Sequence, residues 1–219
     1  MEDVYDQNLG FVTVYFVIDS LMKKVKIVLV GSMHTGKTSI VNRYVYGDFT
    51  LHTVSTTQPA FSQKTLTHKH KEMSLEIWDT AGQERYHALS PLFYRDAEAG
   101  IVVFDITDKE SFSKASKWIS ELKQERGNNV FIVLAGNKSD LDSQRVIDKS
   151  VALKLAQANK APYFETSAKT NDNVESVFTA ICDNVVERMS SMPSSEPSRS
   201  IRSSIQFSDD QKKSEKKCC

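Results

Sequence analysis

The segment KVKIVLVGSMHTGKTSI, residues 24–40, joins a mostly apolar run to a loop that contains two glycines. Residues 31–38 fit the pattern GxxxxGK followed by Ser or Thr, and the run 25–30 before them has the composition of a buried strand. A strand that leads through a glycine-containing turn into a helix is the context that this pattern requires. That order disfavours the alternative, a turn that binds no ligand.

The chemistry of this loop indicates phosphate binding. Gly31 and Gly36 allow the backbone to bend so that successive N–H groups converge on phosphate oxygens, and the following helix adds its positive N-terminal end. Lys37 supplies a positive charge toward the terminal phosphates. Thr38 offers a hydroxyl to Mg²⁺, a cation that keeps most of its waters and takes few protein ligands.

The composition fits one globular domain with short extensions, because 40% of the 219 residues are hydrophobic and 26% are charged. Lysines and arginines number 28 and the acidic residues also number 28, so no overall field draws the protein to nucleic acid. Cys182 lies in an amphipathic helix pattern, and the other two cysteines end the chain. Since this leaves no disulfide framework inside the domain, we expect a reducing, cytosolic setting.

The two ends of the chain differ in character from its middle. Residues 11–18 are apolar but too few to span a bilayer, and acidic residues at positions 2, 3 and 6 argue against a signal peptide. This run is either an extra edge strand or a piece that precedes the working start at Met22, and we favour the second. Beyond Ser190, serine, proline and charge predict a disordered tail. The expected organisation is an extension at 1–21 that need not be native, a globular domain at 22–189 and a tail at 190–219.

Apolar strands alternate with helical patterns from Val25 onward, which is the signature of a mostly parallel sheet covered on both faces. A short polar turn near 68–71 joins two of the strands, so one of them is expected to run antiparallel. We expect Trp118 and Cys182 to pack in the core. The expected strands are 25–30, 60–67, 73–78, 100–104, 130–135 and 163–165. The residues at helical spacing are Phe112, Ala115, Ile119 and Leu122, and then Val174, Val177, Phe178, Ile181 and Val185.

A second polar group follows the expected strand 73–78, in the run WDTAGQE at 78–84. Open α/β sheets place ligands at the carboxyl ends of their strands. Asp79 is placed there to hold Mg²⁺ through water, Gly82 to bring its N–H to a terminal phosphate, and Gln83 to orient a water for in-line attack. An aspartate at a strand end is otherwise usually a helix cap, but Thr38 supplies the other half of a Mg²⁺ site.

The run Asn137-Lys138-Ser139-Asp140 follows the expected strand 130–135 at the same edge of the sheet. A carboxylate accepts hydrogen bonds from two adjacent N–H groups of guanine, whereas adenine presents an acceptor where guanine presents a donor. Such a site rejects the wrong base, because a buried unsatisfied acceptor costs about 1–3 kcal/mol. After the last strand, Ser167-Ala168-Lys169 can add a backbone N–H to the base oxygen. An asparagine-rich turn is the alternative for either run, and their joint occurrence disfavours it.

The motifs GSMHTGKT, WDTAGQE, NKSD and SAK, in this order and spacing, resemble those of the Ras superfamily of small GTPases from Val25 to about Met189. The runs IWDTAGQERYH at 77–87, YRDA at 94–97, FDIT at 104–107 and the terminal Cys-Cys look like Rab family signatures. STTQPAF at 55–61, with His87 and Pro91, is most similar to the Rab branch of early endosomes. The resemblance implies an α/β fold of the P-loop NTPase G domain type: a six-stranded, mostly parallel sheet with one antiparallel strand and helices on both faces.

The resemblance also implies roles for individual residues. Thr56 would bind Mg²⁺ and the terminal phosphate beside Thr38 and Asp79, and Phe49 would pack edge-on against guanine. The expected catalytic residues are Gln83, Lys37 and Thr56. Phe61, Trp78 and Phe93 match the aromatic triad that Rab effectors contact, although tyrosine is usual at the third position. The residues expected to bind GTP or GDP are Gly31, Ser32, Met33, His34, Thr35, Gly36, Lys37, Thr38, Ser39, Phe49, Thr56, Gly82, Asn137, Lys138, Asp140, Ser167, Ala168 and Lys169.

Two departures from the Rab pattern bear on activity. Gln58 and Pro59 stand where most Rabs have a glycine in the first switch, so this segment is expected to be stiffer than usual. Met33 stands where the loop residue is usually small, and its side chain would crowd Gln83 or an incoming arginine finger. The first alternative is therefore a GTP-binding module with little intrinsic hydrolysis. A P-loop kinase or ATPase is a second alternative, which the guanine-reading Asp140 disfavours.

The expected function is a membrane-anchored switch that binds GTP or GDP with Mg²⁺, hydrolyses GTP slowly and recruits effectors in vesicle-mediated and endocytic transport. The resemblance implies that Cys218 and Cys219 are geranylgeranylated by a transferase that acts with an escort protein. A metal-binding cysteine pair is the alternative, which the lack of a neighbouring histidine disfavours. Two lipid chains, at about 0.8 kcal/mol per buried CH₂, anchor a protein stably where one does not.

The resemblance implies several further partners. They are an exchange factor, a GTPase-activating protein that supplies an arginine, effectors and a GDP-dissociation inhibitor. The expected protein is a monomer on the cytoplasmic face of endosomal or other vesicular membranes and cycles with the cytosol. Lys212, Lys213, Lys216 and Lys217 would add attraction to an anionic leaflet of about 1 kcal/mol each.

Overall fold

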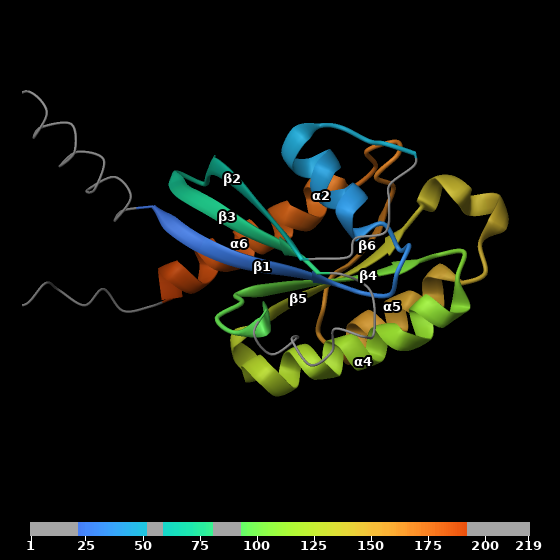
Figure 1. Cartoon of the computed structure of the whole chain (residues 1–219). Helices are drawn as coiled ribbons and strands as arrows, with labels where there is room; N and C mark the ends of the chain where they lie inside the picture. The colour runs from blue at the N-terminus through green and yellow to red at the C-terminus, as the bar shows by residue number, and fades with distance from the viewer. Residues whose placement is uncertain (1–21, 52–58, 81–92, 192–219) are drawn as a thin grey trace, which may run out of the picture.

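The computed structural model describes residues 22–51, 59–80 and 93–191, which contain a six-stranded sheet (Figure 1). The strand order is β2-β3-β1-β4-β5-β6; β2 runs antiparallel to β3, and the other neighbouring pairs are parallel. This confirms the expected sheet, and each expected strand overlaps one that is found. The strands are β1 (Lys23–Val30), β2 (Ala60–His68), β3 (Lys71–Asp79), β4 (Ala99–Asp105), β5 (Phe131–Asn137) and β6 (Tyr163–Thr166).

The place of each strand in the sheet explains its side-chain pattern. β4 lies in the middle and all 7 of its residues are buried, which an apolar run allows. β2 lies at the edge, and along it half-buried residues mostly alternate with exposed ones. Lys69 and His70 form the polar turn between β2 and β3 with positive φ angles of 46° and 63°, the conformation that suits a two-residue hairpin.

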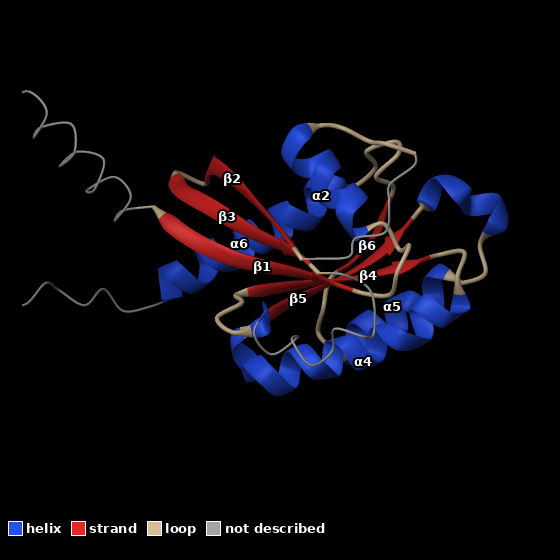
Figure 2. Cartoon of the chain, in the orientation of Figure 1, coloured by secondary structure: helices blue, strands red, loops and turns tan. Residues whose placement is uncertain are grey.

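Helices cover both faces of the sheet (Figure 2). On one face, α2 and α6 pack against Val25, Ile27 and Leu29 of β1. On the other face, α4 and α5 pack against Val28 and Val30 of the same strand. The alternation follows from the two-residue period of a strand, which sends successive side chains to opposite faces. The helices are α2 (Lys37–Tyr46), α4 (Lys109–Arg126), α5 (Lys149–Ala158) and α6 (Val174–Ser191), with 3-10 turns η2 (Gly127–Asn129) and η3 (Ser139–Gln144).

The expected helix faces are confirmed. Ala115, Ile119 and Leu122 of α4 are buried, while Phe112 is partly buried, and all five expected positions of α6 are buried. Trp118 and Cys182 are also buried within these faces. Burial raises the pKa of the Cys182 thiol to about 11, which disfavours the reactive thiolate and fits a packing role.

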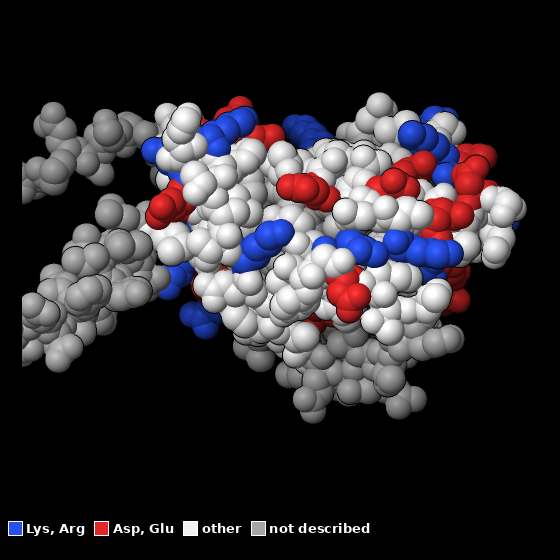
Figure 3. All heavy atoms as spheres, turned by 90° about the horizontal axis from the view of Figure 1, so that it is seen from above, with Lys and Arg blue, Asp and Glu red and all other residues white. Residues whose placement is uncertain are grey.

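The ends of the described chain bear on the expected organisation. α6 continues to Ser191, which lies just beyond the boundary expected after Met189. Residues 1–21 and 192–219 lie outside the described residues, and so do the expected extension and most of the expected tail. Within the described ranges, no helix is long and apolar enough to cross a membrane. Seen from above, acidic and basic side chains lie interspersed among neutral ones, in keeping with the equal totals of the two charges (Figure 3).

Candidate functional site

The loop between β1 and α2 is held in a conformation that only glycine permits at two positions. Gly31 has a φ of 142°, and a side chain there would collide with the carbonyl oxygen of Val103. Gly36 has a φ of 89°, and a side chain there would collide with the amide of Asn137. The loop therefore lies directly against the carboxyl ends of β4 and β5. It occupies the place that the sequence predicts for it.

Lys37 folds back over this loop. Its ammonium donates to the carbonyl oxygens of Gly31 and Ser32, at 2.9 Å in each case. The side chain is buried, and burial lowers the pKa of Lys37 to about 8 while the charge of Asp79 raises it. A buried cation thus stands in the centre of the loop, where it can meet an anion. The Ser32 hydroxyl is also buried and has no hydrogen-bond partner among the described residues.

Thr38 and Asp79 form the second element of the site. The Thr38 hydroxyl, on the first turn of α2, donates to Oδ2 of Asp79 at the end of β3, at 2.5 Å. Asp79 is 2% exposed, and its Oδ1 accepts no hydrogen bond from the described residues. Burial raises the pKa of Asp79, although the Thr38 hydroxyl and the Lys37 charge lower it. A buried, half-satisfied carboxylate beside a hydroxyl is a donor set of hard oxygens, which suits Mg²⁺.

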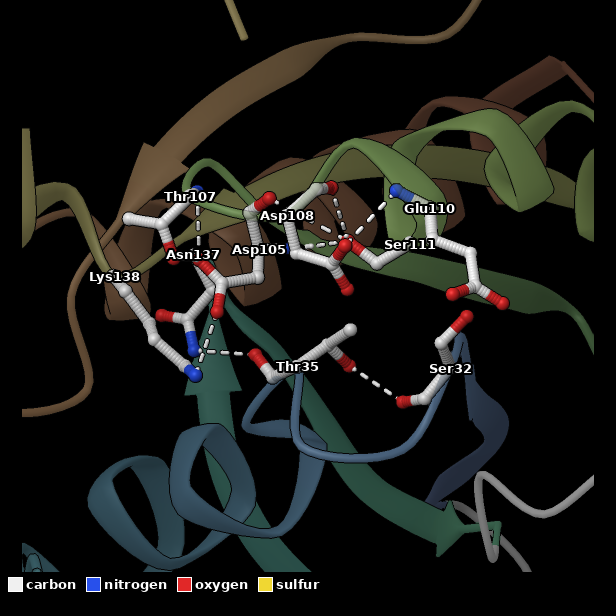
Figure 4. A network of polar contacts seen from close by, with 9 residues as sticks. All are labelled: Ser32, Thr35, Asp105, Thr107, Asp108, Glu110, Ser111, Asn137 and Lys138. Atoms are coloured by element: carbon white, nitrogen blue, oxygen red, sulfur yellow. Dashed lines mark hydrogen bonds and ion pairs between the residues drawn. The ribbon is translucent and has the colours of Figure 1, made fainter. Parts of the chain in front are cut away.

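Asn137 ties the loop to the far half of the sheet (Figure 4). Its Nδ2 donates to the carbonyl oxygen of Thr35 at 2.8 Å, and its Oδ1 accepts from the hydroxyl of Thr166 at 3.1 Å. Both ends of this buried amide are therefore satisfied by segments that lie far apart in the sequence. Thr35 also donates from its hydroxyl to the carbonyl of Ser32 at 3.0 Å, which braces the loop from within.

Lys138 is anchored by a carboxylate that sequence reasoning did not single out. Its ammonium lies 2.6 Å from Oδ2 of Asp105, at the end of β4 (Figure 4). Oδ1 of Asp105 accepts from the backbone N–H and the hydroxyl of Thr107, at 2.8 and 2.7 Å. Lys138 itself has a φ of 68°, the left-handed conformation. The FDIT run contains Asp105, but only the fold brings this residue beside Lys138.

Asp140 and the SAK run meet as the sequence predicts. The hydroxyl of Ser167 donates to Oδ1 of Asp140 at 2.6 Å, and the ammonium of Lys169 lies 3.9 Å from Oδ2. Ser167 also accepts from the backbone N–H of Thr170 at 3.1 Å. Ala168 is buried against the core. The carboxylate is thus oriented by a neighbouring loop instead of turning freely in solvent.

The other predicted site residues that the structure describes lie around these groups. Phe49 is partly buried against the core, with its ring 5.9 Å from the guanidinium carbon of Arg43. Met33 and His34 form an exposed turn of the loop, and His34 has a φ of 61°. Ser39 lies half-buried on the first turn of α2. Arg43 was not predicted from the sequence, because two of its partners, Ala168 and Lys169, lie more than a hundred positions away.

The expected effector-facing aromatics also come together. The rings of Phe61 and Trp78 lie 5.2 Å apart edge to face, and those of Trp78 and Phe93 lie 6.1 Å apart. Phe61 is 51% exposed, which is a large fraction for such a side chain. The ammonium of Lys26 lies 5.2 Å from the Trp78 ring and donates to the carbonyl of Arg95 at 2.6 Å. The three aromatics form a contiguous cluster on β2, β3 and the segment that begins at Phe93.

Several predicted residues lie outside the described residues, so the geometry does not bear on them. These are Thr56 and Gln58 in the first segment, Gly82, Gln83, His87 and Pro91 in the second, and the terminal Cys218 and Cys219.

Comparisons with known proteins agree with this geometry. A model of the Ras family matches residues 26–187 of the chain. Ras-related protein Rab-21 of Geodia cydonium is 44% identical over 164 residues, which cover 75% of this chain and 72% of that protein. Ras-related protein RHN1 of Nicotiana plumbaginifolia is 46% identical over 156 residues, which cover 71% of this chain and 78% of that protein. The chain therefore belongs to the Ras family, as a Rab-related small GTPase that binds guanine nucleotide and hydrolyses GTP.

Proposed function

We propose that this GTPase is a Rab-type switch that binds GTP or GDP with Mg²⁺ and recruits effectors to an endosomal or other vesicular membrane. One observation carries the proposal: Asn137 joins the loop at 31–38 to the strand ends that bear Asp140 and Ser167. The groups that we expect to bind phosphate and those that we expect to bind the base therefore share one edge of the sheet. This is where parallel α/β sheets bind ligands.

At the base end, Asp140 would accept two hydrogen bonds from guanine, and a backbone N–H of the 167–169 segment would donate to the base oxygen. Ser167 holds the Asp140 carboxylate from the side, which supports a fixed orientation. Lys138 is held by Asp105 and would lie along the nucleotide. Preorganised groups of this kind favour guanine because any other base leaves a buried acceptor unpaired.

At the phosphate end, Lys37 and the loop N–H groups would bind the β- and γ-phosphates. Thr38 and Asp79 would hold Mg²⁺, with Thr56 joining them in the GTP state. When bound, Mg²⁺ would neutralise charge that develops on the phosphate oxygens. The buried carboxylate of Asp79 supports this assignment, because its Oδ1 has no hydrogen-bond partner among the described residues, and a cation or its water would provide one.

For hydrolysis, Gln83 would orient the attacking water, and Lys37 would stabilise charge on the transferred group. Chemistry of this kind needs no covalent nucleophile on the protein. An arginine from a GTPase-activating protein would complete the site. The second candidate is a GTP-binding module with little intrinsic turnover, which the exposed Met33 on the loop favours because its side chain is free to crowd the site.

Effector binding and membrane attachment complete the proposal. The cluster of Phe61, Trp78 and Phe93 offers an apolar surface whose order would depend on the bound nucleotide through the segment before Phe93. Geranylgeranyl groups on Cys218 and Cys219 would anchor the chain. The name of one relative, Rab-21, and the Rab-like signatures of the sequence support a trafficking role.

Single-turnover GTP hydrolysis by the full chain tests these two candidates. The rates of wild type, Met33→Gly and Gln83→Leu are compared in Mg²⁺, with Leu153→Ala on the exposed face of α5 as a control for loss of an apolar side chain. A slow wild-type rate that Gln83→Leu nearly abolishes and Met33→Gly hardly changes supports an ordinary switch. A wild type as inert as Gln83→Leu, with activity restored by Met33→Gly, supports the binding module.

A further inference from the structure

Arg43 holds three backbone carbonyls that surround the base end of the site. Its Nε donates to the carbonyl oxygen of Ala168 at 2.8 Å, and its Nη2 donates to that of Lys169 at 3.1 Å. Its Nη1 donates to the carbonyl oxygen of Gly47, just after α2, at 2.6 Å. A planar guanidinium with donors at fixed angles is suited to hold several acceptors at once.

The contacts to Ala168 and Lys169 fix the orientation of peptide units in the segment that begins at residue 167. A peptide unit is planar, so a carbonyl held on one side sets the direction in which the N–H of the same unit points. Arg43 holds two successive carbonyls from the α2 side. The carbonyl of Ala168 shares its peptide unit with the N–H of Lys169, and the carbonyl of Lys169 shares its unit with the N–H of Thr170, so these two units keep one orientation. The Thr170 N–H donates to the hydroxyl of Ser167, which in turn contacts Asp140. Within the 167–169 segment, the N–H whose direction Arg43 fixes is therefore that of Lys169.

The contact to Gly47 links the same guanidinium to the chain that leads to Phe49. Gly47 ends α2 with a φ of 72°, and its N–H donates to the carbonyl of Arg43 at 3.1 Å. The Phe49 ring lies 5.9 Å from the guanidinium carbon. One side chain thus ties together the two segments, at Phe49 and at 167–169, between which we expect guanine to lie.

We propose that Arg43 is a positioning residue for guanine, which acts by holding the Ala168 carbonyl so that the N–H of Lys169 meets the base oxygen. This inference rests on the proposed guanine site. Arg43 itself does not touch the base; it acts through the peptide units that it fixes. Its loss leaves the phosphate-binding loop and the Thr38–Asp79 pair in place, because the carbonyls that Arg43 holds belong to other segments.

The chain offers a matched control in Arg188 on α6. Arg188 makes the same kind of clamp, with donors to the carbonyl oxygens of Asn129 at 3.0 Å and Glu98 at 3.3 Å. Those carbonyls precede β5 and β4, at the amino ends of the strands, away from the site. A loss of stability that follows from removing an arginine clamp will appear in both Arg43→Ala and Arg188→Ala. A loss of base recognition will appear only in Arg43→Ala.

The test measures the affinity of the full chain for GDP and for 6-thioguanosine 5′-diphosphate, which differs from GDP only at the base oxygen. Sulfur is a weak acceptor, so the analogue gains little from a well-placed N–H. We expect Arg43→Ala to weaken the binding of GDP about tenfold, which corresponds to the loss of roughly one hydrogen bond. The binding of the analogue should weaken about threefold or less. Arg43→Lys, which can reach one carbonyl but not three, is expected to fall between wild type and Arg43→Ala for GDP.

Arg188→Ala is expected to change both affinities by less than about twofold, because its carbonyls lie outside the site. Equal losses for the two nucleotides, or an unchanged GDP affinity in Arg43→Ala, would overturn the inference. If Arg43→Ala does not fold, Arg43→Lys decides by the same ratio of losses. A wild-type chain that fails to bind GDP would instead overturn the proposed site and the inference with it, an outcome that the wild-type measurement alone reveals.

Discussion

The base end and the phosphate end of the site differ in how far the protein satisfies its own polar groups. At the base end, Asp140 is bonded by Ser167, and Lys138 is paired with Asp105. At the phosphate end, the Lys37 ammonium covers its own loop, and one oxygen of the buried Asp79 has no partner among the described residues. We infer that the base end is organised before nucleotide binds, whereas the phosphate end is completed by its ligand.

The largest effect is expected at the base end for Asp140→Asn. Because an amide N–H then faces a guanine N–H, GDP affinity should fall about 100-fold or more. Xanthosine diphosphate, which offers an oxygen at that position, should gain. Competition against a fluorescent GDP measures both affinities. Asp142→Asn is the control, because Asp142 is exposed and pairs with Arg145 at 2.7 Å. An unchanged GDP affinity in Asp140→Asn would show that Asp140 does not bind guanine.

The second effect concerns the buried Lys37. Its pKa is lowered from 10.5 to about 8 by burial, so the charged form is disfavoured in the folded state. The stability that this shift contributes is fully present above pH 10.5 and is lost as the pH falls through about 8. In nucleotide-free protein, the free energy of unfolding should therefore rise between these pH values, by at most about 3 kcal/mol.

Chemical denaturation at several pH values measures this rise in wild type and in Lys37→Met, where it should be absent. Added GDP should reduce it, because phosphate oxygens favour the charged ammonium. The same pH dependence in both proteins, with or without nucleotide, would mean that Lys37 does not carry the buried charge of the phosphate end.

A smaller effect is expected for the Thr38–Asp79 pair. Removal of Mg²⁺ should speed the release of GDP from wild type about tenfold, since the loss is that of roughly one contact to a charged group. Thr38→Ser keeps the hydroxyl and should behave like wild type, whereas Thr38→Val should release GDP at one rate with or without Mg²⁺. Stopped-flow fluorescence gives the rates. A Mg²⁺ effect of full size in Thr38→Val would place the cation elsewhere.

The smallest effect is expected for Ser167→Ala. It removes the hydroxyl that orients Asp140 but leaves the carboxylate itself, so GDP affinity should fall only about fivefold, or ~1 kcal/mol. Isothermal titration with GDP measures the change. Ser113→Ala on the exposed side of α4 is the control, since its hydroxyl donates to the carbonyl of Glu110, one turn earlier in the same helix, at 2.8 Å. A loss as large as that of Asp140→Asn would show that Ser167 does more than orient its neighbour.

The sequence predicted correctly those parts of the structure that depend on residues close together in the chain. The strand at 25–30, the two loop glycines and the periodic residues of α4 and α6 all lie where they were expected. Residues at the ends of parallel strands could also be placed at one edge, because the fold class brings those ends together. Asp79, Asn137 and Asp140 were predicted in this way.

Contacts between distant segments could not be predicted from one sequence. Arg43 contacts Ala168, which lies 125 positions away in the sequence. An arginine in a helix pattern gives no sign of whether its side chain makes such a contact or is solvated. Asp105 looks like any residue at the end of a strand until β4 and β5 place it beside Lys138. The turn at Lys69 and His70 takes positive φ angles without glycine, which the composition of the turn does not indicate.

Amide hydrogen exchange of the full chain, nucleotide-free and then with GDP and Mg²⁺, tests the difference between the two ends most directly. We expect nucleotide to add large protection to residues 31–38 and a much smaller gain to 137–140 and 167–170, both measured relative to β4. Gains at 137–140 and 167–170 that equal or exceed the gain at 31–38 would contradict it, because the base end would then also be formed by its ligand.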